Sequence, residues 1–374
     1  MNPAARLSAD GLYAPLNAGW LRERGVHDVL GPEAEMDLVA LVNSQLPIPN
    51  SQEIARLAFI QPDRQDLLPL DQYASLQMPD GSLRVMGNTD ATRGCKHLCR
   101  HCPIVPVYQG QFRVVPVEIV IDDIRAQVAA GARHISFGDP DFLNGPTHAL
   151  RIIERFAREF PGISYDATIK IEHLLDHAEM LSALRDTGCL FITSAVESID
   201  DEVLVKLRKG HSRADFAWAV ALCRQAGIRL TPTFIPFTPW TSVEAYAELL
   251  DALDELDLVE DVAPIQLAIR LLVTAESPLL ELPDIAAVVE PFDPTSLTWP
   301  WRHADPRVDA LHTGVMRIVR DAGDAPRADA FDAISALTRE TLGRAPAARV
   351  QRDGTAGPRV TEPWYCCAEP MEPF

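Results

Sequence analysis

Short β-branched runs alternate with amphipathic helical runs between Leu83 and Leu272, and this alternation limits the fold more than any other feature of the chain. A strand followed by a helix and then by the next parallel strand is the repeating unit of α/β folds. Six such units are present, with strands expected at 83–88, 134–137, 163–171, 189–196, 228–235 and 265–272. Six parallel strands predict an α/β fold with a partial (β/α)6 barrel of the TIM type.

The chain outside this predicted barrel core, residues 83–275, divides into four parts. Residues 1–45 have the pattern of a short α/β fragment. Residues 46–82 contain five prolines, which favour an irregular connector. We expect a helical extension over 276–345, followed over 346–374 by a flexible linker and a cysteine-containing tail.

Composition and charge exclude several classes of protein. With 47% hydrophobic residues in 374, the chain can bury a large core, and its net charge of -19 disfavours non-specific binding to nucleic acid or to an anionic membrane. The N-terminus lacks the pattern of a signal peptide, and no apolar stretch reaches the roughly 18 residues that a membrane span needs. We therefore expect a cytoplasmic protein that acts on a small molecule or on a protein.

Cys95, Cys99 and Cys102 form a C-x3-C-x2-C pattern shortly after the first expected strand. Loops at the carboxyl ends of parallel barrel strands carry the active sites of such folds. Three thiolates from one short loop can ligate three irons of a [4Fe-4S] cluster and leave the fourth iron without a protein ligand. The open iron indicates a reactive cluster.

Other metal sites compete with this interpretation. The loop could hold structural zinc with His97 or His101 as the fourth ligand, although zinc sites more often begin with a C-x2-C pair. A cluster used only for electron transfer would require a fourth cysteine ligand, which the loop lacks. A third alternative is a non-catalytic metal-binding or redox-sensing protein, in which loop and tail cysteines together hold zinc or a saturated cluster.

The cysteine loop and its place after the first strand resemble the radical S-adenosylmethionine (SAM) superfamily over residues 83–275. The resemblance implies that SAM binds the open iron through its amino and carboxylate groups, and that one electron from the cluster cleaves SAM to methionine and a carbon radical. It also implies a [4Fe-4S] cluster and SAM as cofactors. A flavodoxin- or ferredoxin-type protein is the implied electron donor.

The same resemblance suggests which residues bind SAM. Gly138 and Asp139 lie where the superfamily has a glycine-rich turn that meets the SAM amino group, although the aspartate departs from that pattern and a simple proline-containing turn is the alternative. Glu197 matches a polar residue that faces the ribose or methionine part of SAM. The alternative for Glu197 is a carboxylate at the start of a helix.

Lys170 and Arg270 are charged residues inside apolar runs, where an unpaired charge is costly. We expect them to be cofactor-binding residues that face an anionic group of SAM in the barrel mouth. The alternative is pairing with a neighbouring carboxylate such as Asp166 or Glu172.

The tail contains adjacent cysteines, Cys366 and Cys367, whose mutual disulfide would be strained. Thiols so placed suit soft metals, metalloids or redox chemistry. The ending Cys-Cys-Ala-Glu-Pro resembles the radical SAM family named for its CUAEP or CCAEP tail, in which some members carry selenocysteine at the second position. This resemblance implies that both cysteines take part in catalysis or substrate capture; the alternative is a tail with incidental cysteines.

These patterns predict an enzyme in which a SAM-derived radical modifies a small molecule, with transfer of a methyl, aminocarboxypropyl or other alkyl group to a soft element or to carbon as the alternative. Residues 1–45 resemble the second half of a cobalamin-binding domain and are interpreted as its remnant. Two explanations for the missing first half are a start codon assigned too late and a fragment that has become a scaffold. The chain has no Asp-x-His-x-x-Gly motif, so cobalamin is left open but not predicted. Asp141, His173 and His211 are candidates for an acid or base, and each of them could equally be structural.

Overall fold

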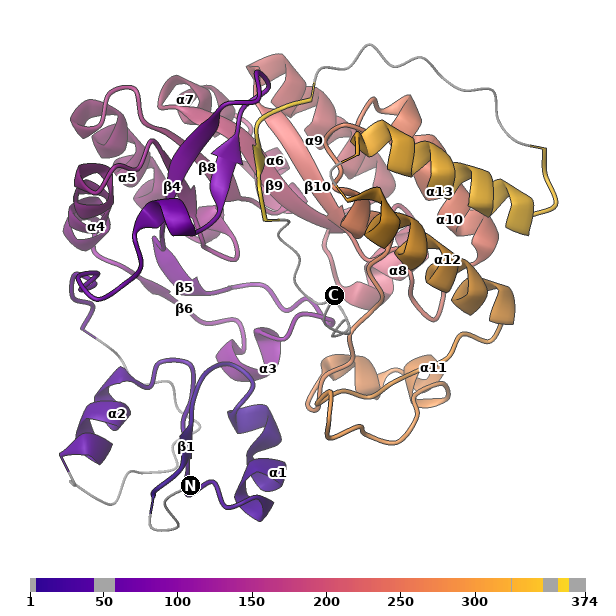
Figure 1. Ribbon diagram of the computed structural model, residues 1–374, viewed down its shortest axis with the longest axis horizontal. Coiled ribbons are helices and arrows are strands. Elements are labelled where there is room, and N and C mark those ends of the chain that lie inside the picture. The colour runs from indigo at the N-terminus through magenta and orange to yellow at the C-terminus, as the bar shows by residue number, and fades with distance from the viewer. Residues whose placement is uncertain (1–4, 44–57, 324, 346–355, 363–374) are drawn as a thin grey trace.

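A mixed sheet covered by helices forms the centre of the molecule (Figure 1). The computed structural model describes residues 5–43, 58–323, 325–345 and 356–362. Within these ranges the sheet has the strand order β10-β9-β8-β7-β4-β3-β11. Its parallel strands are β4 (Leu83–Thr89), β7 (His134–Phe137), β8 (Ser164–Thr168), β9 (Cys189–Glu197) and β10 (Arg229–Phe234). Five of the six predicted strands are therefore confirmed.

The connections between these strands are helical, as βα units require. They are α4 (Val117–Ala129), α5 (Pro146–Glu159), α6 (Ile171–Asp176), α7 (Met180–Asp186), α8 (Asp201–Leu207) and α9 (Arg213–Ala226). α10 (Val243–Glu255) follows β10 and packs against the C-terminal helices α12 (Pro306–Ala322) and α13 (Arg327–Thr341). The predicted helical extension is thus present.

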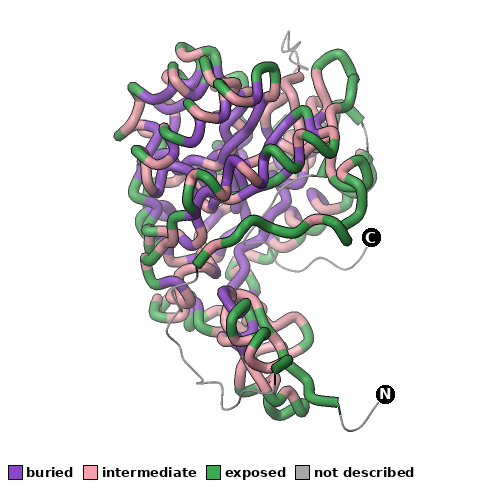
Figure 2. Tube along the Cα trace, turned by 90° about the vertical axis from the view of Figure 1, so that its left-hand side faces the viewer, coloured by how far each residue is buried: buried purple, intermediate pink, exposed green. Residues whose placement is uncertain are grey.

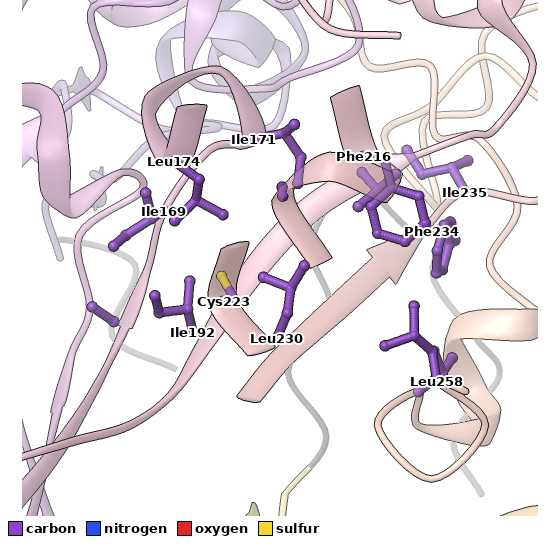
Figure 3. Close-up of a cluster of buried hydrophobic side chains, with 14 of the residues drawn as sticks. Ile169, Ile171, Leu174, Ile192, Phe216, Cys223, Leu230, Phe234, Ile235 and Leu258 are labelled. Carbon is purple, nitrogen blue, oxygen red and sulfur yellow. The ribbon is translucent and has the colours of Figure 1, made fainter. Parts of the chain in front are cut away.

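The two faces of the sheet differ in polarity. Side chains alternate between the faces of a strand, and Ile135, Phe137 and Tyr165 point into the apolar core between sheet and helices, where each is at most 1% exposed. Figure 3 shows another part of this core, in which Ile192 and Leu230 lie beside Cys223. The opposite, inner face is polar, and it forms the wall of the barrel.

The sixth predicted strand, at 265–272, is wrong. Pro264 begins a 3-10 helix, Pro264–Leu267, and the chain then forms only an isolated parallel bridge between Phe237 and Arg270. The side chain of Gln266 accepts a hydrogen bond from Phe234 N, so a side chain satisfies the backbone group at the end of β10. A proline at the first helical position favours the helical turn over a strand.

The N-terminal fragment forms a small lobe of its own below the barrel (Figure 2). It pairs β1 (Ser8–Ala9) with β2 (Asp28–Val29) in a parallel two-stranded sheet, with α1 (Ala18–Glu23) and α2 (Glu35–Val42) beside it. This matches the expected α/β fragment, while its origin as a cobalamin-binding domain stays a prediction.

Two segments are more regular than expected. Within the predicted connector, β3 (Ser75–Gln77) pairs antiparallel with β4, and within the predicted linker, β11 (Arg359–Val360) pairs antiparallel with β3. The sheet edge supplies backbone partners that a sequence pattern does not reveal. Cys366 and Cys367 lie outside the described residues. In the described part of the chain, no helix is long and apolar enough to cross a membrane.

Candidate active site

A cavity of about 520 Å³ opens at the carboxyl ends of the parallel strands. Its walls come from β4, β7, β8, β9 and the cysteine loop. Seven residues singled out from the sequence line it: Cys95, Cys99, Cys102, Gly138, Asp139, Lys170 and Glu197. The fold thus brings together the predicted cluster ligands and four of the five predicted SAM-binding residues.

The cysteine loop is held by a hairpin of β5 (Thr92–Gly94) and β6 (Phe112–Val114). Gly94 has a φ of +79°, and a Cβ there would lie 2.6 Å from Gln111 O and would also collide with the Tyr108 ring. Asn144 pins the loop from the other side, accepting from Lys96 N at 3.2 Å and donating to Gly94 O at 3.3 Å. These contacts hold the start of the cysteine loop in one conformation.

The three thiols fit a cluster with one open iron. Burial raises the pKa of Cys95 to about 12 and also raises the pKa of Cys99, whereas nearby Lys209 and Lys170 act in the opposite direction on Cys99. Iron binding displaces thiol protons, and the two ammonium groups would offset the negative charge of the resulting thiolates. The other cysteines that the structure describes, Cys189 and Cys223, are buried in the apolar core.

Glu197, the last residue of β9, links the sheet to the cysteine loop. It adopts a left-handed φ of +71°, and its Oε1 lies 3.1 Å from His101 Nε2 and 3.3 Å from Lys209 Nζ. Burial alone would raise the pKa of Glu197, but Lys209 and His101 outweigh burial and lower it to about 2. The carboxylate thus stays charged and holds the loop against the strand end. Its predicted contact with SAM stays a prediction.

Asp139 supports the chain that leads into the cysteine loop. Its two carboxylate oxygens accept hydrogen bonds from Ala91 N at 2.8 Å and Thr92 Oγ1 at 2.6 Å, and burial raises its pKa to about 7. The preceding Gly138 leaves room for a tight approach, since a Cβ there would lie 2.6 Å from Asp90 Oδ1. The structure therefore gives Asp139 a positioning role, and a contact with SAM is untested.

Lys170 and Arg270 behave differently from one another. Lys170 lines the cavity and donates to Glu172 Oε2 at 2.6 Å, so Glu172 rather than Asp166 is its partner. Arg270 does not line the cavity. Its guanidinium pairs with Asp309 at 2.8 Å and stacks on Trp301 at 3.7 Å from the ring centre. These contacts explain its charge structurally, and its predicted role in SAM binding has no support from them.

Sequence patterns alone did not reveal how Asp141 and His173 relate to the cysteine loop. His173 Nδ1 lies 2.6 Å from Asp141 Oδ2, and His173 Nε2 lies 3.2 Å from Nε2 of His97, which belongs to the loop. Burial would raise the pKa of Asp141, but the two imidazoles outweigh it and lower it to about 2. The signal that could have found this group is the position of Asp141 and His173 just beyond the carboxyl ends of two neighbouring strands.

The comparisons with known proteins agree with this geometry. Residues 90–253 match the family model described as the radical SAM superfamily. The chain is 28% identical over 126 residues to bacteriochlorophyllide d C-12(1)-methyltransferase of Chlorobaculum tepidum, covering 33% of this chain and 27% of that protein. It is 27% identical over 160 residues to hopanoid C-3 methylase of Methylococcus capsulatus, covering 43% and 30%. The chain therefore spans less than a third of the length of these two relatives.

A solved structure with the same fold is that of OxsB, a cobalamin-dependent S-adenosylmethionine radical enzyme, with aqua-cobalamin bound. The alignment has a TM-score of 0.62 and covers 90% of this chain and 58% of that chain at 15% identity. At this identity the likeness concerns the fold alone, and it confirms the predicted partial barrel. Residues 90–253, which contain the cysteine loop and most of the strand ends that form the cavity, match the radical SAM superfamily, and this region is therefore a radical SAM domain.

Proposed function

We propose that this protein cleaves SAM reductively and directs the resulting carbon radical to a small organic molecule inside the barrel. The observation that carries the proposal is the placement of Cys95, Cys99 and Cys102 in one cavity at the carboxyl ends of the strands. When bound there, the cluster supplies the electron that breaks a carbon–sulfur bond of SAM. The cavity volume is within the usual range for small-molecule sites.

The chain's own residues would bind and orient SAM. Lys170 and Lys209 bring positive charge to the cavity wall beside the cysteine loop, where the SAM carboxylate would lie. Glu197 and the backbone at Gly138 offer acceptors for the amino and ribose hydroxyl groups. Because Lys209 and Glu197 are each at most 4% exposed, their charges act with little screening by water.

The start of the C-terminal tail supports a role for the tail cysteines. Val360 and Glu362 line the same cavity. Cys366 and Cys367 follow Glu362 by four and five residues, and an extended chain of that length spans roughly 13 to 17 Å. We propose that these thiols act at the cavity mouth in substrate capture or redox chemistry.

A second candidate function is transfer of a methyl or other alkyl group from SAM to carbon or to a soft element. Two relatives are named as a methyltransferase and a methylase, and the adjacent tail thiols suit a soft acceptor. Cobalamin is named for OxsB, but the present chain lacks the Asp-x-His-x-x-Gly motif, so cobalamin is not part of the proposal.

Electron paramagnetic resonance of the anaerobically reconstituted, reduced protein tests the proposal. We expect a four-iron signal that shifts when SAM is added, together with 5′-deoxyadenosine or another SAM fragment on chromatography. Cys99→Ala should abolish both, whereas Cys223→Ala, a substitution in the apolar core, should keep both. Zinc in place of iron, or an iron signal that SAM leaves unchanged, would favour the structural-metal or sensor alternative.

A further inference from the structure

The inner face of the barrel carries a polar layer deeper than the cysteine loop. The strand register aligns Asn88 with Ser136, Ser136 with Asp166, and Asp166 with Phe191, so these four side chains occupy one level of the barrel wall. All four line the cavity. Asp166 is the only carboxylate in this layer.

Asp166 is held in place from behind. Its Oδ1 accepts from His134 Nε2 at 2.8 Å, and its Oδ2 accepts from Ser136 Oγ at 3.0 Å. His134 is fully buried, and its Nδ1 lies 2.9 Å from Ser164 Oγ, which also accepts from the Arg84 guanidinium at 3.3 Å. Hydrogen bonds thus connect Arg84 through Ser164 and His134 to Asp166.

This arrangement orients the Asp166 carboxylate at the cavity wall. Among the described residues, no lysine or arginine forms an ion pair with Asp166, whose hydrogen-bond partners are His134 and Ser136. The two lysines of the cavity wall are already paired, Lys170 with Glu172 and Lys209 with Glu197. A carboxylate that is 5% exposed is costly to bury without a counterion, and each of its oxygens keeps a lone pair beyond the one already used.

We propose that Asp166 anchors a protonated amine or guanidinium group of the substrate. This inference rests on the proposed function, since it names the substrate class of that same cavity. The hydroxyls of Thr168 and Thr193 lie at the neighbouring level and complete a polar end for the site, while Met86 and Phe191 provide an apolar wall for the rest of the molecule. The substrate is therefore a cationic small molecule with an apolar portion.

The test compares three probes of equal length that differ only in the head group: hexylamine, hexanol and hexanoate. Each is titrated to tens of millimolar into the reconstituted, unreduced holoenzyme with SAM, and affinity is read from the rise in melting temperature. We expect hexylamine to bind at least about tenfold more tightly than hexanol or hexanoate, because a hydrogen-bonded ionic contact is lost with either. Equal binding of hexylamine and hexanol would overturn the inference.

Variants of the protein test whether Asp166 causes the preference for hexylamine. Asp166→Asn should weaken hexylamine binding at least about tenfold and leave hexanol binding unchanged, with Ser136→Ala as a second variant that keeps the carboxylate but loosens it. Asp123→Asn is the matched control, because Asp123 is equally buried but pairs with Arg64 outside this cavity. Unchanged hexylamine binding in Asp166→Asn would refute the proposal.

The SAM-dependent shift of the cluster signal separates this inference from the proposed function. If the wild type shows no shift, the proposed function fails whatever the probes do. If the shift is present but the probes show no preference for the amine, only the assignment of Asp166 fails. Loss of the shift in Asp166→Asn would mean that Asp166 serves SAM itself, and that result would also overturn the inference.

Discussion

The ion pair between Glu197 and Lys209 provides a quantitative test of how the site is held together. The two side chains are 5% and 3% exposed, and Lys209 Nζ lies 3.3 Å from Glu197 Oε1. Glu197→Gln keeps the shape of the side chain but leaves the Lys209 ammonium buried without a counterion. It also weakens the contact to His101, and so the tie between β9 and the cysteine loop.

The expected cost follows from the pKa. Burial acts to raise the pKa of Glu197, yet Lys209 and His101 lower it from 4.5 to about 2. The lowered pKa means that the pair stabilises the folded state, and removing one member of such a buried pair costs roughly 3 to 5 kcal/mol. Because the folded pKa lies below the unfolded one, this stabilisation is fully present above about pH 4.5 and is lost as the pH falls toward 2.

Urea unfolding of the full chain, followed by circular dichroism with all variants in the same metal-loading state, measures this cost. We expect Glu197→Gln and Lys209→Met each to lower the free energy of unfolding by about 3 kcal/mol. The double variant should lose clearly less than the sum, since it leaves neither charge unpaired. A loss below about 1 kcal/mol in the single variants, or strict additivity in the double variant, would refute this account of the pair.

Three further predictions follow from single features of the site. Gly94→Ala should lower the iron content after reconstitution, since Gly94 has a positive φ and no space for a Cβ; Gly131→Ala, with a positive φ but open space, is the control. If the tail thiols capture substrate, Cys366→Ala and Cys367→Ala should each keep SAM cleavage within about twofold but lower formation of the modified product at least about tenfold. Chromatography of 5′-deoxyadenosine and the modified product from one reaction measures both effects. An incidental tail would change neither. The pKa of Asp139 is about 7 in the folded state and 3.8 in the unfolded state, so folding favours the protonated carboxyl. The free energy of unfolding should therefore fall as the pH rises from about 4 to 7. Asp139→Asn should flatten this fall, which urea unfolding at several pH values across that range measures.

The strands were predictable because their signal is local. An apolar run of four to eight residues bounded by Gly, Pro or polar residues predicts a buried strand whatever its neighbours are. This reasoning placed β7 at its observed bounds and the other four parallel strands within a few residues. It failed at 265–272, where the apolar run is equally strong but Pro264 and the side chain of Gln266 favour a helical turn.

The candidate site was predictable only in part, for a related reason. The spacing of Cys95, Cys99 and Cys102 is a local pattern, and so are the charges of Lys170 and Arg270 within apolar runs. The partner of Lys170 is two residues away in the chain, whereas the partner of Arg270 is 39 residues away. Lys170 meets Glu172 at the cavity, whereas Arg270 meets Asp309 on α12, and the two runs contain no difference that foretells this outcome.

The sequence by itself thus determined the α/β class, the order of the strands along the chain and the candidate ligands of the cluster, because hydrophobic period and ligand spacing act over a few neighbouring residues. Only the tertiary structure decided which side chains converge. It placed His134 behind Asp166, Lys209 beside Glu197, and the end of the described C-terminal segment at the cavity. Such contacts depend on the register and closure of the sheet, because a shift of one residue in register would turn the side chains of His134, Asp166 and Glu197 to the opposite face.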